Sequence, residues 1–146
     1  MLVNDVLSSK SRRLITVTAD TSVTRAMTLL LEHRISCLPV VDAQGRLVGI
    51  VSDKDIFKLV HEHPDDFKQR PIGDIMTVHL FTSRPSEDLI GIAGLMTTRR
   101  IRHVPVLDQG RLVGLISIGD VVKAQLDEVV SENEYLRKYI SGDYPA

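Results

Sequence analysis

An internal repeat dominates this sequence of 146 residues. The stretch that starts at Ile35 and the stretch that starts at Ile101 share a Pro-Val pair, an Asp, a Gly-Arg-Leu-Val-Gly run and a Ser-x-x-Asp ending. The repeat is about 65 residues long, whereas solenoid units are roughly 20–50 residues long. We therefore expect one duplicated small domain. The matching positions include Pro39 and Pro105, Asp42 and Asp108, Ser52 and Ser117, Asp55 and Asp120, and Lys58 and Lys123.

Each copy opens with the pattern of an amphipathic helix. Apolar residues recur at three- and four-residue spacing, which places them on one face. We expect Asp20 or Thr21 to cap the first helix and Ser86 to cap the second, because short polar side chains accept the free N–H groups of a first turn. The apolar positions are Val23, Ala26, Met27 and Leu30 in the first copy, and Leu89, Ile92, Ala93 and Met96 in the second.

A β-hairpin and a second helix follow in each copy. Apolar runs at 38–41 and 104–107 predict one strand, and the runs at 47–51 and 112–116 predict its partner. The turns between them contain Gly45 and Gly110, which can adopt a positive φ. Helices should then begin at Ser52 and Ser117. The second strands are apolar without interruption, which predicts burial on both faces.

Neither copy is large enough to hold a stable core alone. Packing the two sheets together would bury the remaining apolar faces and create a pseudo-twofold pair with two equivalent clefts at the seam. The predicted fold class is α+β. We divide the chain into a first repeat at 1–62, a linker at 63–71, a second repeat at 72–126 and a C-terminal helical extension at 127–146.

The motif apolar-Pro-Val-apolar-Asp, turn Gly, apolar-Val-Gly-apolar-apolar-Ser-x-x-Asp resembles the tandem CBS (cystathionine-β-synthase) domains, also called Bateman modules. It occurs at 38–55 and at 104–120, and the resemblance covers the chain from about Val3 to about Leu126. It implies repeats of the order β-α-β-β-α. It also implies that the chain binds an adenosine-type ligand, such as AMP, ADP, ATP, NAD(H) or S-adenosylmethionine, and needs no catalytic cofactor.

The same resemblance assigns roles to particular residues. Asp55 and Asp120 would hold a ribose diol, and Ser52 and Ser117 would contact ribose or phosphate. A carboxylate can accept from both hydroxyls of a diol, and the free N–H groups of a helix start favour phosphate. In the family, the ribose Asp of one repeat usually faces the base pocket of the other. The positions matching the adenine-lining residues are Ile35, Ser36, Ile101, Arg102, Thr16 and Thr82.

The two copies differ beside these positions. Where the first has Ser36-Cys37, the second has Arg102-His103, which could hold a phosphate. Asp53 in the first copy would repel a phosphate, and Lys54 would offset that repulsion. We expect unequal affinities at the two clefts, and the sequence leaves open which cleft Arg102 and His103 serve.

Two interpretations of the Ser-x-x-Asp motifs are open. They also fit a capping box, in which the Ser and the acid cap a helix start reciprocally. The nucleotide interpretation gives a regulatory module that acts on an unidentified partner protein in trans. The alternative is a degenerate pair that serves as a dimerisation or interaction scaffold without a physiological ligand.

Composition and the lack of catalytic motifs argue against several other classes of function. The 18 basic and 19 acidic residues leave a formal net charge of -1, which predicts no nucleic-acid or membrane partner. A single cysteine, Cys37, excludes an internal disulfide and a cysteine zinc cluster. His61 and His63 are spaced two apart and face different ways on a helix, so no metal site is expected. No catalytic motif occurs, and we expect a non-enzymatic cytoplasmic protein.

The C-terminal region continues as a helix with heptad-like spacing. Leu126, Val129, Asn133, Leu136 and Ile140 occupy a and d positions, with Asn133 at an a position. The helix could form a short coiled seam with a second chain, or it could lie back on its own module. We expect a homodimer in either case.

Overall fold

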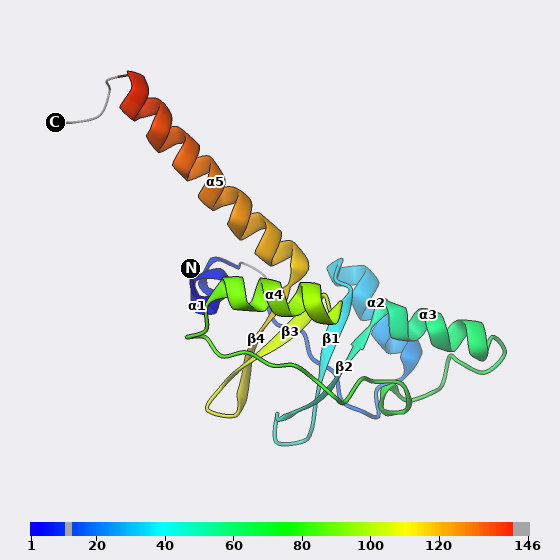
Figure 1. Cartoon of the computed structure of the whole chain (residues 1–146). Coiled ribbons are helices and arrows are strands. Elements are labelled where there is room, and N and C mark those ends of the chain that lie inside the picture. Colours follow the sequence, from blue (N-terminus) through cyan, green and yellow to red (C-terminus); the bar gives the residue numbers. More distant parts are fainter. Residues whose placement is uncertain (11–12, 142–146) are drawn as a thin grey trace.

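The computed structural model describes residues 1–10 and 13–141 (Figure 1). It is a mixed α+β fold with two small antiparallel sheets and a long C-terminal helix, which confirms the predicted fold class. The elements are α1 (Val3–Ser9), α2 (Val23–His33), β1 (Cys37–Val41), β2 (Leu47–Ser52), α3 (Asp53–Glu62), the 3-10 helix η1 (Ile72–Asp74), α4 (Leu89–Arg99), β3 (His103–Asp108), β4 (Arg111–Ser117) and α5 (Ile118–Ser141).

The two hairpins have the same register. β1 pairs with β2 so that Cys37 lies opposite Ser52, and β3 pairs with β4 so that His103 lies opposite Ser117. The first strand of the expected β-α-β-β-α order is reduced in each repeat to one parallel bridge, at Val17 and at Ser83. The turn glycines have φ of 79° and 80°, in the region that favours glycine.

The helix caps differ from the prediction. The side chain of Ser22 accepts a hydrogen bond from Arg25 N at the start of α2, and Asp88 accepts one from Ile90 N at the start of α4. The predicted caps Asp20, Thr21 and Ser86 were wrong because the chain first makes a turn in each repeat. In the first repeat, for example, Thr21 N donates to Thr18 O at 3.0 Å.

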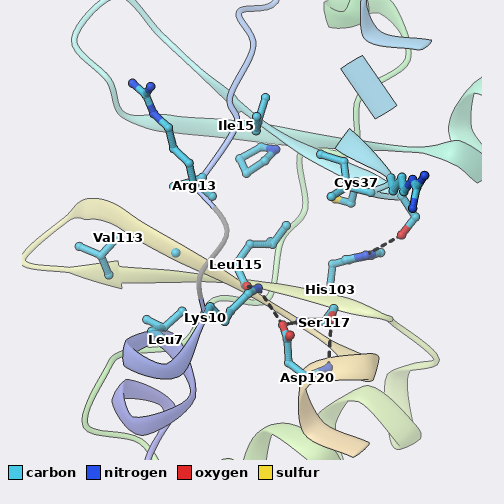
Figure 2. A pocket seen from close by; sticks show the side chains of 16 residues that line it. Leu7, Lys10, Arg13, Ile15, Cys37, His103, Val113, Leu115, Ser117 and Asp120 are labelled. Atoms are coloured by element: carbon cyan, nitrogen blue, oxygen red, sulfur yellow. Dashed lines mark hydrogen bonds and ion pairs between the residues drawn. The ribbon is translucent and has the colours of Figure 1, made fainter. Parts of the chain in front are cut away.

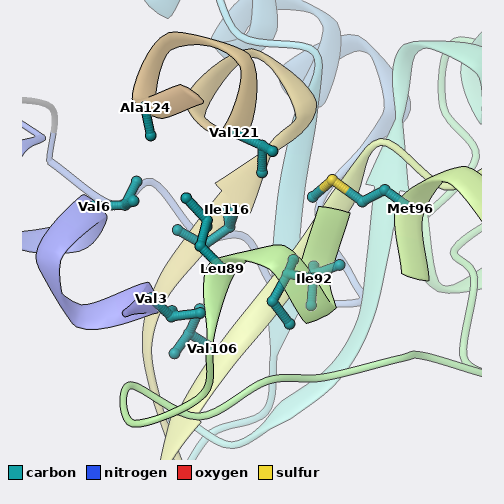
Figure 3. Close-up of a cluster of buried hydrophobic side chains, with 10 residues drawn as sticks. Val3, Val6, Leu89, Ile92, Met96, Val106, Ile116, Val121 and Ala124 are labelled. Atoms are coloured by element: carbon teal, nitrogen blue, oxygen red, sulfur yellow. The ribbon is translucent and has the colours of Figure 1, made fainter. Parts of the chain in front are cut away.

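Each of the two hydrophobic cores contains residues from both repeats of the sequence. Val3 and Val6 of α1 pack with Leu89 and Ile116 in the core of the second repeat (Figure 3). Ile72 of η1 is buried in the core of the first repeat, and its N–H donates to Thr21 O at 2.8 Å. Each repeat is therefore completed by a segment from the start of the other, so the chain crosses the seam between them repeatedly.

The first strand of each hairpin is buried on both faces. The prediction of two buried faces for the second strands was wrong, because only alternate residues of β2 and β4 are buried and Val113 is 45% exposed. Leu38 and Val40 of β1 point into the first core, whereas Cys37 and Pro39 line a cavity that they share with residues of β4. Pro39 and its counterpart Pro105 are both fully buried. The pairing register brings the first residue of β1 beside the start of α3, and the first residue of β3 beside the start of α5.

α5 begins in the second repeat and then leaves it. Val121 and Ala124 are buried, and the helix beyond them projects from the body of the molecule (Figure 1). Within the described residues, no helix is both long and apolar enough to cross a membrane. Residues 142–146 of the predicted C-terminal extension lie outside the described part.

Candidate functional site

A cavity of about 540 Å³ lies between the two repeats (Figure 2). The linker after α1 forms part of it, the start of β1 contributes from the first repeat, and β4 with the start of α5 contributes from the second. A volume of this size lies in the usual range for small-molecule sites, roughly 300–1,000 Å³. Its lining residues are Leu7, Lys10, Arg13, Leu14, Ile15, Arg34, Ile35, Ser36, Cys37, Pro39, His103, Val113, Gly114, Leu115, Ser117 and Asp120.

Asp120 is held at the start of α5 by a reciprocal cap. Ser117 N donates to Asp120 Oδ2 at 2.8 Å, and Asp120 N donates to Ser117 Oγ at 3.1 Å. Lys10 Nζ also donates to Oδ2, at 2.8 Å. The bonds from Ser117 N and from Lys10 Nζ both go to Oδ2. The Asp120 side chain keeps 20% of its surface exposed, which leaves the carboxylate reachable from the cavity.

Lys10 was missed by sequence reasoning and is central to the cavity. Its ammonium bonds both Asp120 and the backbone carbonyl of Leu115, each at 2.8 Å (Figure 2). Partial burial opposes ionisation of Asp120, but the bonds from Lys10 and Ser117 outweigh it and hold the pKa of that carboxyl below its usual value. The carboxylate is therefore charged at neutral pH.

The charge lining the cavity is mainly positive. Lys10, Arg13 and Arg34 contribute three cations, whereas Asp120 is the one carboxylate among the lining residues. Arg13 comes from the linker after α1, and Arg34 is the left-handed C-cap of α2. An anion with a hydroxyl-bearing group suits this arrangement, because the cations attract its charge and the carboxylate accepts its hydroxyl protons.

The opposite wall of the cavity is apolar. Ile15 and Ile35 lie near Pro39 and Cys37 on the side of the first repeat. Cys37 is buried, and burial together with the nearby Asp55 and Asp53 raises the pKa of its thiol to about 12. The thiol is therefore a neutral apolar surface at neutral pH, suited to contact with an uncharged ring.

His103 connects the two repeats across the cavity. Its Nε2 lies 3.0 Å from Ser36 Oγ, within hydrogen-bond distance. Burial and then the neighbouring Arg102 lower the pKa of His103, in spite of Asp53 and Asp120. The imidazole is therefore neutral at neutral pH, and it contributes a hydrogen-bonding group rather than a charge.

The pseudo-equivalent site at Asp55 is built differently. Ser52 N and Oγ both donate to Asp55 Oδ2, at 2.9 and 3.1 Å, in the same kind of cap. Here the incoming chain after η1 forms a bridge with β2: Ile50 N donates to Thr77 O at 3.0 Å, and Thr77 N donates back at 2.8 Å. The neighbouring Met76 lies so close to Gly49 that a Cβ there would come within 2.8 Å of its sulfur.

Arg102 lies beside this second site. Its guanidinium pairs with Asp53 Oδ1 at 3.0 Å, from one repeat to the other. Lys54 and Thr82 are exposed, and Ile101 is half-buried. The 540 Å³ cavity therefore brings together Ile35, Ser36, His103, Ser117 and Asp120 of the predicted set, whereas it excludes Ser52, Lys54, Asp55, Thr82, Ile101 and Arg102. Thr16 lines a neighbouring cavity with Arg13 and Ile15.

No candidate metal centre accompanies these sites. Within residues 1–10 and 13–141, no three His, Cys, Asp or Glu side chains come together in a way that could hold an ion.

Comparisons with known proteins identify the family. The family model for the CBS domain matches twice, at residues 3–62 and 72–127. A relative named CBS domain-containing protein CBSX3, mitochondrial, from Arabidopsis thaliana is 33% identical over 97% of this chain and 73% of that protein.

Two solved structures of similar proteins contain ligands. CBSX2 in complex with AMP, a protein of Arabidopsis thaliana, has a TM-score of 0.72 and 34% identity over 86% of this chain and 96% of that one. The CBS domain pair of MJ0100, in complex with 5'-methylthioadenosine and S-adenosyl-L-methionine, has a TM-score of 0.78 and 32% identity over 88% of this chain and 98% of that one. The chain described here belongs to the CBS-domain family and carries its two domains in tandem.

Proposed function

We propose that this chain is a non-catalytic regulatory module that binds an adenine nucleotide in the Asp120 cavity. One observation carries the proposal: Asp120, Lys10 and an apolar wall from the other repeat line the same cavity. Asp120 Oδ1 would accept from the ribose hydroxyls, and Ile15 and Ile35 would contact the base. Charged hydrogen bonds of this kind contribute roughly 1.5–3 kcal/mol each.

The cations favour a phosphorylated ligand. Lys10, Arg13 and Arg34 would attract phosphate, and Lys10 could keep its bond to Asp120 while it contacts a phosphate oxygen, because an ammonium has three donors. AMP, ADP, ATP and NAD(H) all fit this chemistry. Uncharged adenosine lacks the phosphate, and S-adenosylmethionine carries a sulfonium cation in its place. The AMP bound to the similar CBSX2 supports a phosphorylated ligand, whereas the similar MJ0100 pair holds S-adenosyl-L-methionine, so the titration below must include both.

The ligand would act by joining the repeats. Ile35 and Ser36 come from the first repeat, whereas Ser117 ends β4 of the second repeat and Asp120 lies in the first turn of α5. A ligand that contacts both sides favours one relative position of the repeats, and a partner that binds only that position senses the ligand. We propose that the partner is a protein, acting in trans, which contacts the module near α5.

The scaffold hypothesis has a specific observation in its favour. Asp120 and Asp55 each serve a helix cap, and Lys10 already pairs with Asp120. The carboxylates therefore have a structural role without any ligand, and the bonds between Ser36 and His103 and between Arg102 and Asp53 would hold the repeats together. The two hypotheses differ in whether a nucleotide binds with saturation at physiological concentration.

Calorimetric titration of the full chain with AMP, ATP, NADH, S-adenosylmethionine and adenosine tests the proposal. We expect saturable binding, with the phosphorylated ligands tighter than adenosine, and no consumption of ATP or NADH during the titration. A ligand that binds only the folded chain should also raise its melting temperature. Absence of binding by every ligand in the series favours the scaffold, whereas turnover of a ligand identifies an enzyme.

A further inference from the structure

Within residues 1–10 and 13–141, no other segment buries the outer part of α5. After Ala124, none of the described residues of this helix is buried. Most helical stability in proteins comes from packing of an apolar face rather than from intrinsic propensity. Large apolar side chains are exposed along the helix, with exposed fractions of 59% at Leu126, 52% at Val129, 53% at Leu136 and 83% at Ile140.

These side chains form one stripe. Leu126, Val129, Asn133, Leu136 and Ile140 follow the alternating three- and four-residue spacing of the a and d positions of a heptad. In the same heptad frame, the buried anchors Val121 and Ala124 fall at c and f, on the side of the helix opposite this stripe. The side of α5 that holds it to the body is therefore not the side that presents the stripe.

The polar residues beside the stripe indicate what covers it. Glu132 stands at a g position and Arg137 at the e position five residues later. In a parallel two-stranded coiled coil, a g residue lies beside the e residue of the following heptad in the other strand, where opposite charges attract. A second copy in register would thus pair Glu132 of each copy with Arg137 of the other.

An antiparallel pair lacks this complementarity. It would place e positions against e positions, and those positions hold Lys123, Val130 and Arg137, without a carboxylate. The single polar residue in the stripe points the same way. Asn133 at an a position would face Asn133 of the second copy in a parallel pair, where the two amides can bond and fix the register.

We propose that residues 126–140 of α5 form a short parallel coiled coil with the same residues of a second copy of the chain. The pair would project from both bodies along a shared axis. Because Asp120 lines the cavity and lies in the first turn of α5, the two proposed nucleotide cavities would lie at the base of one common stalk. The pairing itself does not depend on nucleotide binding.

Sedimentation equilibrium of the full chain tests the pairing. At tens of micromolar we expect a mass near twice the 16.3 kDa of one chain. Leu136→Asp should restore the monomer mass, because it buries a charge in the seam. Ser131→Asp, which adds the same charge at an outward f position, should leave the dimer intact. A monomeric wild type, or a dimer that survives Leu136→Asp, overturns the proposal.

Cysteine cross-linking tests the orientation. Asn133→Cys should form an interchain disulfide under mild oxidation, since its two copies face each other only in a parallel, in-register pair. Ser131→Cys should not, and the native Cys37 is buried. Failure of Asn133→Cys to cross-link while the mass stays dimeric overturns the parallel arrangement.

A charge exchange tests the partner contacts. Glu132→Arg and Arg137→Glu should each weaken the dimer, and the double variant should recover most of the lost affinity. Helix content and melting temperature of the body serve as folding controls for all variants. A double variant no tighter than the single ones would remove the Glu132–Arg137 pairing.

Discussion

The two clefts of this module contain the same motif but differ in the chain that enters them. At the Asp120 cleft, the linker after α1 contributes Lys10, whose side chain bonds Asp120 and Leu115 O. At the Asp55 cleft, the chain after η1 bonds with its backbone at the matching position, through Thr77 and Ile50. A side-chain bond leaves room for a cavity, whereas a backbone bridge occupies the strand edge. We therefore propose that the segments after α1 and after η1 determine which copy of the duplicated motif holds a ligand.

Charge sharpens the same contrast. The Asp120 cavity has three lining cations, whereas at the Asp55 cleft Arg102 is paired with Asp53. Both carboxylates make equivalent helix caps, so the caps cannot account for a difference in binding. A substitution at one cleft can therefore be compared with the matching substitution at the other cleft, which serves as its control.

The largest expected effect comes from the two carboxylates. Asp120→Ala should weaken AMP binding about tenfold or more, because it removes charged hydrogen bonds of roughly 1.5–3 kcal/mol each. Asp55→Ala should leave the tighter site unchanged. Both variants lose a cap, at about 1 kcal/mol each, and Asp120→Ala also loses the ion pair with Lys10. Calorimetric titration and thermal unfolding of both variants measure this, and equal loss of binding in both would abolish the distinction between the clefts.

The matched glycines should differ in stability. A Cβ at Gly49 would come within 2.9 Å of the backbone oxygen of Thr77, which is fixed by the bridge to β2, whereas a Cβ at Gly114 would meet only the end of the Leu7 side chain. Gly49→Ala should therefore destabilise the fold by roughly 1–3 kcal/mol, and Gly114→Ala by less. Denaturant unfolding compares them. A greater loss of stability in Gly114→Ala than in Gly49→Ala would contradict the proposed difference between the two entering segments.

Substitution of Lys10 should separate phosphate recognition from ribose recognition. Lys10→Gln should weaken AMP binding about fivefold, a modest loss because this ammonium is partly exposed. Adenosine binding should change less, and Arg102→Ala should leave AMP binding at the tighter site unchanged. Calorimetric titrations of these variants with AMP and with adenosine measure the changes in affinity. If Lys10→Gln weakened the two ligands equally, Lys10 would position Asp120 without contacting phosphate.

The smallest effect concerns pH. The pKa of His103 is lowered from 6.5 in the folded chain by burial and by Arg102. Its contribution to stability is therefore complete above pH 6.5 and is lost as the pH falls toward the folded-state pKa, because the unfolded chain binds the proton first. His103→Gln should flatten the fall in melting temperature below pH 6.5. Cys37, its counterpart, stays neutral because its pKa is about 12. An unchanged pH profile in His103→Gln would assign the effect to other groups.

Local patterns predicted the repeated elements and the position of both Ser-x-x-Asp motifs at helix starts. The spacing of apolar residues and the turn glycines act over a few residues, so the sequence contains them directly. The helix caps were harder, because a preceding turn shifted the start of α2 to Ser22 and that of α4 to Asp88.

The role of Lys10 could not be predicted from local sequence patterns. Its partner Asp120 lies 110 positions away, and the two meet only because α1 packs on the second repeat. The difference between the clefts also depends on contacts between distant parts of the sequence, because the segments after α1 and after η1 each cross to the other repeat. One signal was available: Lys10 and Arg13 stand in a short basic linker directly before Thr16, which matches an adenine-lining position of the family.

Isoleucine methyl NMR during an AMP titration tests the inequality of the clefts most directly. Ile15 and Ile35 line the Asp120 cavity, whereas Ile101 occupies the matching position at the other cleft. We predict that the methyl signals of Ile15 and Ile35 shift and saturate first, with Ile101 little changed. Saturation of Ile101 before them, or no shift at any of the three, would contradict the assignment of the nucleotide to the Asp120 cavity.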